Sequence, residues 1–405
     1  MSESEEEREL PELPHNVIVD ILSRLHCKSL VKFRCVSKQW NSLIRSHKFA
    51  KLQFSRSIGD TSRQCVLLRP EPFCSINYED LDEFFEDRFE LINQEDVPPL
   101  VAGVDIDNDA DLIGECNGLL CFMLMKRDQK SFLLWNPTTR ECKEVRKNDV
   151  ANLVDVRCCM FDFDIRTTSD TKDRADMYGF GYDSISDDYK IVRLMSDLPR
   201  TKVVDVEIYM VGRQTWRKIE HPVSGMICIF RNDFRVDNCA FLNGACHWFT
   251  YKFATNDTAI LRFDLGKEEL EELTLPPYLS KSDFISEVLV LGGKLVLPNK
   301  INDIEMDIWI MNEYGVGSSF TKKMTVYASQ GSESTNFVSP ICFSKNDSVL
   351  IYDDGGYRLL MYYPESKTWK EAVGHWRQNH LTLYAETLFS PYHIPIAEPN
   401  LGETA

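Results

Sequence analysis

The sequence lacks several features, and each absence argues against a class of protein. No apolar run approaches the roughly 20 residues that a membrane-spanning helix needs, so no membrane partner is predicted. The 13 cysteines form no C-x-x-C pair, which argues against a zinc site or a disulfide framework. Lys and Arg number 46 against 63 Asp and Glu, and the net charge of −17 argues against nucleic acid as a partner. The opening "MSESEEERELPE" has no apolar core, so we expect no secretory signal and a cytoplasmic location, with the nucleus as a second candidate.

Motifs for catalysis are missing as well. No G-x-S-x-G elbow occurs, and "GFGYDS" lacks the third Gly of a dinucleotide-binding loop. The pair His375 and His380 has no third ligand nearby in sequence. We therefore predict a non-enzyme with no cofactor and no metal. A propeller enzyme that uses its central channel remains an alternative at this point.

A block of amphipathic helix stands at the front of the chain. Its apolar residues Val17, Ile21, Leu22 and Leu25 recur at helical spacing on one face. Ser29 and Ser37 are predicted to cap a second and a third short helix. Three helices in about forty residues bury little surface by themselves. The surplus of apolar residues therefore indicates docking, either onto a partner or onto the rest of the chain.

Charge is distributed unevenly along the chain. Nine bases and no acid lie between Arg24 and Arg56, which gives +9. Fifteen acids against one base lie between Glu71 and Glu115, which gives −14. Such polarity can steer an acidic partner to one end of the molecule and a basic partner to another.

The remainder of the chain reads as short strands separated by turns. One strand–turn–strand unit recurs about every fifty to sixty residues, which is near the period of a kelch-like propeller. Its copies are residues Phe132–Val145, Glu207–Ile219, Ile260–Leu273, Ile308–Met324 and Leu359–Ala372. "CVLLRP" and "FELINQ" would close a further blade together with "LYAETLFSP". The predicted fold is a small all-α three-helix unit followed by an all-β kelch-like propeller of about six blades, with five or seven as alternatives.

Two stretches carry a resemblance to known families. "LPHNVIVDILSRLHCKSLVKFRCVSKQWNSLIRSHKFAKL" resembles an F-box, with His26 at a position where the family usually has Pro. "CNGLLCF", "LLWNPTTRECKEV", "GFGYDSISDDYKIVRL" and "VEIYMVGRQTWRKI" resemble the plant F-box-associated domain, a kelch-like propeller. "WIMNEYG" and "YAETLFSP" are similar to the S-locus F-box type, whose members recognise self-incompatibility ribonucleases. The resemblance implies an acidic N-terminus (1–9, disordered), an F-box (10–56), a propeller (62–394) and a disordered tail (395–405).

The resemblance also implies partners and contact residues. An F-box docks onto a Skp-type adaptor, which joins a cullin and a RING subunit in a ubiquitin ligase, so the chain would be its substrate-recognition subunit. The target would be a protein such as a basic ribonuclease, bound by propeller loops. Adaptors of this kind are acidic, so the +9 stretch between Arg24 and Arg56 would assist their association with the chain. A scaffold without degradation is the alternative. The implied adaptor contacts are Leu13, Pro14, Val17, Ile21, Leu22, Leu25, Leu30, Val31, Val36 and Trp40.

The acidic run "YEDLDEFFED" lies outside the repeat pattern. Its aromatic residues alternate with carboxylates, and we expect it on an exposed insertion that helps to dock a basic target. A solvated loop is the simpler interpretation. The candidate target contacts are Asp80, Asp82, Glu83, Phe84, Phe85 and Glu86.

Overall fold

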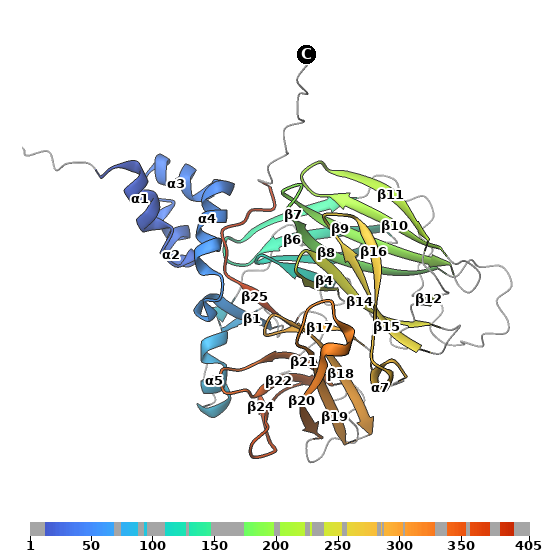
Figure 1. The fold of residues 1–405 in the computed structure, drawn as a ribbon. Helices are drawn as coiled ribbons and strands as arrows, with labels where there is room; N and C mark the ends of the chain where they lie inside the picture. Colours follow the sequence, from blue (N-terminus) through green and yellow to red (C-terminus); the bar gives the residue numbers. More distant parts are fainter. Residues whose placement is uncertain are drawn as a thin grey trace, which may run out of the picture.

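Helices α1 to α4 form one unit, and a ring of sheets forms the other (Figure 1). We call residues 13–57 the helical unit. The predicted disordered ends, 1–9 and 395–405, lie outside the described part of the chain. The computed structural model describes residues 13–68, 74–87, 93–94, 110–126, 129–146, 174–197, 203–222, 227–228, 239–252, 257–281, 285, 287–302, 304–328, 338–353, 357–372 and 381–392.

Serine caps set the start of two helices in the helical unit. The Oγ of Ser37 accepts the N–H of Trp40 at 3.1 Å, and that of Ser46 accepts the N–H of Phe49 at 3.3 Å. These bonds satisfy first-turn N–H groups that have no partner within the helix. Ser29 lies within a helix, so its predicted role as a cap is wrong, and a fourth helix extends the predicted three. The helices are α1 (His15–Leu22), α2 (Cys27–Phe33), α3 (Lys38–Arg45) and α4 (His47–Ser57).

The described strands form six antiparallel sheets, which are the blades of a propeller. Blade 1 contains β25 (Thr382–Ala385), β1 (Gln64–Leu68), β2 (Cys74–Asn77) and β3 (Asn93–Gln94). Blade 2 contains β4 (Ala110–Cys116), β5 (Leu119–Lys126), β6 (Gln129–Asn136) and β7 (Glu141–Arg146). Blade 3 contains β8 (Arg174–Asp183), β9 (Asp188–Asp197), β10 (Val203–Met210) and β11 (Thr215–Pro222).

The second half of the ring follows the same plan. Blade 4 contains β12 (Ile227–Cys228), β13 (Ala240–Leu242), β14 (Ala245–Lys252), β15 (Asp257–Asp264) and β16 (Glu269–Thr274). Blade 5 contains β17 (Leu289–Leu291), β18 (Lys294–Asn302), β19 (Glu305–Met311) and β20 (Phe320–Tyr327). Blade 6 contains β21 (Val338–Phe343), β22 (Val349–Asp353), β23 (Arg358–Tyr363) and β24 (Thr368–Ala372). All five predicted copies of the repeat coincide with the two outer strands of a blade, so the predicted fold class is confirmed.

Blade 1 closes the ring with strands from both ends of the propeller. Strand β25 pairs with β1, with Gln64 opposite Ala385, as the sequence predicts. Strand β2 was not predicted, and "FELINQ" contributes only the short β3. The innermost strand of each blade lies against its neighbour, and β25 contacts both β4 and β21. Closure of this kind leaves no long unpaired sheet edge.

Asn-Gly turns explain how two of the inner hairpins reverse. Asn117 and Gly118 have φ of 52° and 76°, and Asn243 and Gly244 have φ of 51° and 74°. Two-residue hairpins need positive φ at both positions, which Asn and Gly tolerate. At Gly118 a side chain would also collide, because a Cβ there would lie 2.3 Å from the carbonyl oxygen of Ala385. The turn of blade 2 therefore fits against the closing strand only with Gly.

Hydrophobic clusters fill the spaces between neighbouring blades. Trp135 belongs to the cluster of blades 1 and 2, and the Nε1 of Trp369 donates to the carbonyl of Tyr327 at 2.9 Å across blades 6 and 5. A further cluster joins buried residues of the helical unit to blades 2 and 3 and to Phe389 near the C-terminus. The helical unit and the propeller therefore share one core.

Candidate docking surfaces

Part of the helical unit presents apolar side chains to solvent. Leu13, Val17, Ile21 and Val36 are 58%, 36%, 47% and 59% exposed. We call these four residues the exposed apolar set. Large apolar side chains grouped on a small unit mark an interaction surface, because burial against a partner removes them from water.

The other predicted adaptor contacts divide into three kinds. Pro14 is exposed beside the exposed apolar set, whereas Leu25, Val31 and Trp40 are half-buried. Leu22 and Leu30 are only 2% and 0% exposed, within the core that joins the helices to the propeller. Their predicted position on the contact surface is therefore wrong, because the helical unit needs them for its own packing.

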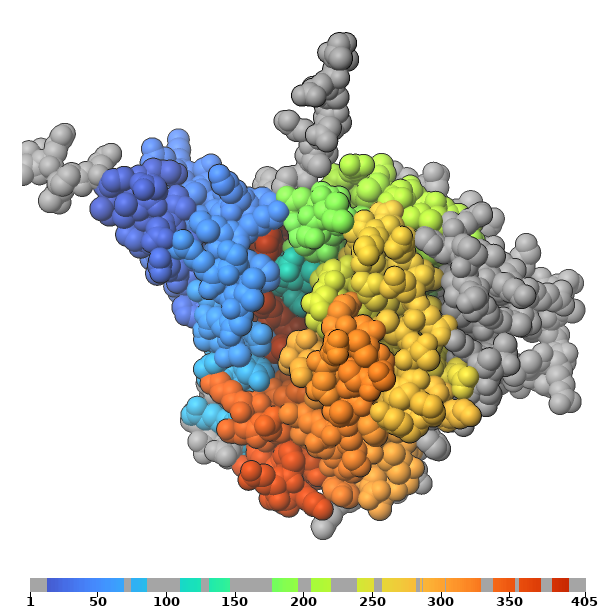
Figure 2. All heavy atoms as spheres, viewed as in Figure 1, coloured from blue at the N-terminus to red at the C-terminus, as the bar shows by residue number. Residues whose placement is uncertain are grey.

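A short C-terminal segment fills the seam between the helical unit and the propeller. Phe389 lies with its ring centroid 5.5 Å from those of both Phe54 and His47, and 6.4 Å from that of Tyr189. Asn136 donates to the carbonyl of Phe389 at 2.7 Å. In Figure 2 the red C-terminal segment is visible between the blue helices and the teal strands. Phe389 thus contacts both units at once.

Ion pairs surround this seam. Glu141 accepts from Arg34 at 3.3 Å and from Arg45 at 3.0 Å. Lys51 lies 2.5 Å from a carboxylate oxygen of Asp187, and Lys28 lies 2.6 Å from one of Glu386. Burial alone would raise the pKa of Asp187, but the bonds from Lys51 and from the Tyr182 hydroxyl hold that pKa below its ordinary value.

These pairs change the interpretation of the +9 stretch. Six of the nine bases contact an acid of this same chain. Two of them, Arg24 and Arg56, pair with Asp20 inside the helical unit, and the other four pair with acids of the propeller as described above. Lys32, Lys38 and Lys48 are exposed. Four of the nine bases therefore hold the helical unit on the propeller, and the prediction that the whole stretch attracts an adaptor is too broad.

The acidic run forms a short 3-10 helix (Tyr78–Asp80) followed by helix α5 (Leu81–Asp87), and the two Phe rings of α5 turn inward. Phe84 and Phe85 are 8% and 6% exposed and pack edge to face, 5.2 Å apart, in the cluster of blades 1 and 6. Their expected place on an exposed insertion is wrong, because those two blades offer an apolar surface that covers them.

The acids of this run lie in different settings. Asp80 is half-buried and Glu83 is exposed. Asp82 accepts from the Nδ2 of Asn346 at 3.0 Å, and the side chain of Glu86 lies outside the described part. Only the acids, and not the rings, therefore remain candidates for contact with a target.

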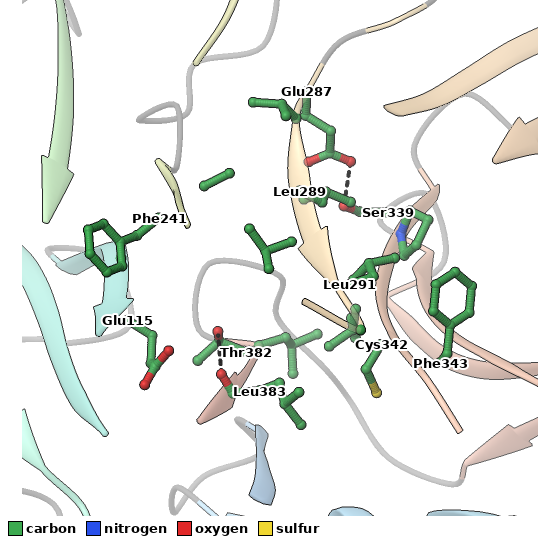
Figure 3. Close-up of a pocket in the computed structure, with 18 of the residues that line it drawn as sticks. Glu115, Phe241, Glu287, Leu289, Leu291, Ser339, Cys342, Phe343, Thr382 and Leu383 are labelled. Carbon is green, nitrogen blue, oxygen red and sulfur yellow. Dashed lines mark hydrogen bonds between the residues drawn. The ribbon is translucent and has the colours of Figure 1, made fainter. Parts of the chain in front are cut away.

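A cavity of about 550 Å³ lies between the innermost strands. Residues of β4, β13, β17, β21 and β25 line it, so it is the central channel of the propeller (Figure 3). Its lining is about equally polar and apolar: Phe241, Leu289 and Leu383 stand beside the acidic residues Asp111, Glu115 and Glu287. A cavity that combines apolar side chains with convergent polar groups can bind a ligand through both.

Glu287 and Glu115 are both hydrogen-bonded within the protein. Glu287 accepts from the hydroxyl of Ser339 at 2.6 Å. Glu115 accepts the backbone N–H of Gly118 at 2.7 Å. Burial raises the pKa of Glu115 to about 7, although backbone donors at Gly118 and Ala385 oppose the shift. Glu115 therefore links the Asn117–Gly118 turn of blade 2 to the closing strand β25 at the end of the channel nearest the F-box.

The described residues show neither a membrane-spanning helix nor a metal centre. Within those ranges no helix is long and apolar enough to span a bilayer. In the same ranges no three His, Cys, Asp or Glu side chains are grouped so as to hold a metal ion.

Comparison with known families agrees with this architecture. The family described as "F-box associated beta propeller domain" matches residues 67–386, and "F-box domain" matches residues 10–52. The chain belongs to the F-box-associated propeller family. Its helical unit is the F-box, and its six blades are the associated propeller.

Members of this family from Arabidopsis thaliana resemble the chain over most of its length. F-box protein CPR1 is 25% identical over 373 residues, which cover 88% of this chain and 83% of that protein. An F-box/kelch-repeat protein is 26% identical over 372 residues, or 88% of this chain and 91% of that protein. Among solved structures, TolB from Acinetobacter baumannii aligns with a TM-score of 0.40 at 11% identity over 81% of this chain and 67% of that one. That last likeness is too slight to bear on function.

Sequence reasoning missed the seam and the residues that line the channel. Leu388 and Phe389 lie three and four residues after the end of the closing strand, and that apolar pair was a signal for further packing. The acids Asp111, Glu115 and Glu287 carried no local signal, since they belong to different blades. Only the closed ring brings them to one cavity.

Proposed function

We propose that this chain is the substrate-recognition subunit of a Skp–cullin–F-box ubiquitin ligase. The F-box would bind a Skp-type adaptor, and the propeller would bind the protein to be modified. The chain would contribute no catalytic residue, because holding a target near a charged enzyme raises the effective concentration of its lysines.

The exposed apolar set carries this proposal. The shared core leaves Leu13, Val17, Ile21 and Val36 in water, although the same unit buries Leu22 and Leu30 almost completely. Four exposed apolar side chains on an F-box match the docking role that an adaptor requires. The ion pairs of the seam would then fix how the propeller is held relative to the adaptor.

Binding to a recombinant Skp-type adaptor tests the proposal directly. The double variant Val17→Asp/Ile21→Asp should weaken the complex about 100-fold or more by calorimetry, because two unpaired charges would enter an apolar interface. Ile304→Asp is the matched control, since Ile304 is 61% exposed on blade 5. Adaptor binding that is absent in the native chain, or equal in both variants, would contradict the proposal.

A second experiment separates a ligase subunit from a scaffold. A target recovered by affinity purification with the proteasome blocked is added to the assembled ligase with its cullin and RING subunits. Ubiquitin transfer that depends on the chain supports the degradative role. Stable binding without transfer favours the scaffold.

The resemblance to the S-locus type supports a narrower proposal, that the target is a basic ribonuclease. The same purification tests it. Targets that include no basic ribonuclease would remove it and would leave the receptor role intact.

A further inference from the structure

The central channel has two distinct ends. Strand β4 runs toward the F-box. It leads to Asn117, whose carbonyl accepts from the hydroxyl of Thr387 at 2.8 Å, and Thr387 follows Glu386, which pairs with Lys28 of the F-box. Strand β25 runs the same way, since it leads to Glu386, the partner of Lys28. Asp111 and Thr382 stand at the opposite ends of these two strands.

Strand β21 has the same direction. It leads to Lys345, which pairs with Glu79, and Glu79 accepts in turn from Thr61 just after α4. Ser339 therefore lies at the end of β21 that is remote from the F-box, and Glu287 is hydrogen-bonded to it. We call Asp111, Glu287, Ser339 and Thr382 the polar mouth.

Apolar walls follow directly behind the polar mouth. Each of three mouth residues is followed within two positions by an apolar residue. Leu289 follows Glu287, Ile341 follows Ser339 and Leu383 follows Thr382. These three apolar side chains are half-buried around the cavity. Figure 3 shows Leu289 and Leu383 on strands that border the same hollow as Glu287. The cavity of about 550 Å³ is large enough for several side chains of a peptide.

The charge of the lining has one sign. Three acidic residues line the cavity, and none of the described residues that line it is Lys, Arg or His. A cationic group would be attracted to such a lining, and an anionic one would be repelled. Because apolar side chains share the lining with these acids, an apolar residue beside the cation would fill the remaining space.

We propose that the polar mouth binds a target segment in which a Lys or Arg adjoins a bulky apolar residue. This inference rests on the proposed receptor function and names the chemistry of the target. The cationic side chain pairs with Glu287, and the apolar side chain enters between Leu289, Ile341 and Leu383. The target then approaches from the end of the channel that is remote from the F-box.

A random peptide library displayed on phage and selected on the full chain bound to its adaptor tests this inference. We expect enriched clones to place Lys or Arg beside a bulky apolar residue. For a synthetic enriched peptide, Glu287→Gln should weaken binding about tenfold, and so should replacement of its Arg by the neutral isostere citrulline. The Ser339 hydroxyl can still donate to the Gln carbonyl, so this variant should fold. Glu365→Gln, an exposed acid between β23 and β24, is the charge-matched control.

Each outcome decides the matter. Enrichment of acidic or neutral peptides, no enrichment, or equal binding by both variants would overturn the inference while adaptor binding persists. Failure of the native chain to bind the adaptor would instead count against the receptor role. A chain without adaptor that still selects basic-apolar peptides through Glu287 would preserve the inference alone.

Discussion

Helices α1 and α5 both carry apolar residues at helical spacing, yet they expose different kinds of side chain. In α1, Val17 and Ile21 remain in water, and Leu22 turns toward the shared core. In α5, Phe84 and Phe85 are buried, and Glu83 faces solvent. One helix therefore offers apolar surface to a partner, and the other offers only charge.

The difference follows from what lies beside each helix. Helix α5 rests on the junction of two blades, whose cluster includes Leu68 and Met361 and covers both rings. Helix α1 has apolar residues on more than one side, but only one side meets the core. Amphipathic spacing identifies a helix, whereas the number of neighbouring surfaces decides which apolar residues stay exposed.

The largest expected effect comes from truncating one residue in each helix. Phe85→Ala should lower the free energy of unfolding by about 3–4 kcal/mol, because a buried ring leaves a cavity. Ile21→Ala should change it by less than about 0.5 kcal/mol and should instead weaken adaptor binding. Urea denaturation measures the first quantity and calorimetry the second. Equal stability losses would contradict the contrast between α1 and α5.

The side of the helical unit that faces the propeller provides a second test. Phe389→Ala should lower the free energy of unfolding by about 3 kcal/mol, because the Phe389 ring packs against both units. Thermal unfolding should then show the helical unit melting before the propeller. Tyr357→Ala is the control, since that aromatic residue is 55% exposed on blade 6. A single unshifted transition in the Phe389 variant would show that the seam contributes little.

Local features of the fold were predictable because their causes are local. The Asn117–Gly118 turn follows from the dihedral preferences of its own two residues, and the Ser37 cap lies beside the N–H that it accepts. The burial of Phe85 depends on strands of blade 6, far along the chain. The channel depends on all the blades together, so no segment of the sequence encodes Glu287 as a mouth residue.

The ion pairs of the seam give a smaller effect. Glu141→Gln should lower the free energy of unfolding by about 2 kcal/mol, because Arg34 would be left largely buried without its carboxylate. The loss should be largely insensitive to salt. Asp20→Asn removes a solvent-exposed carboxylate that pairs with Arg24 and Arg56, and it should change stability less. If the two variants unfold alike in urea, the pairs at the seam are no stronger than surface pairs.

The exposed and half-buried acids of the acidic run, Asp80 just before α5 and Glu83 within it, should give the smallest effect. Asp80→Asn/Glu83→Gln removes charge without disturbing the buried rings, so the free energy of unfolding should stay within about 0.5 kcal/mol.

Asp80 and Glu83 lie on the same side of the propeller as the F-box, since Glu79 contacts Thr61 after α4, whereas the polar mouth opens at the other end. They can therefore steer a basic target without holding it, and we expect the association rate to fall about twofold at low salt and not at all near 0.5 M. Stopped-flow binding of the purified target measures this rate. A larger loss, or one carried by the dissociation rate, would mean that Asp80 or Glu83 contacts the bound target after all.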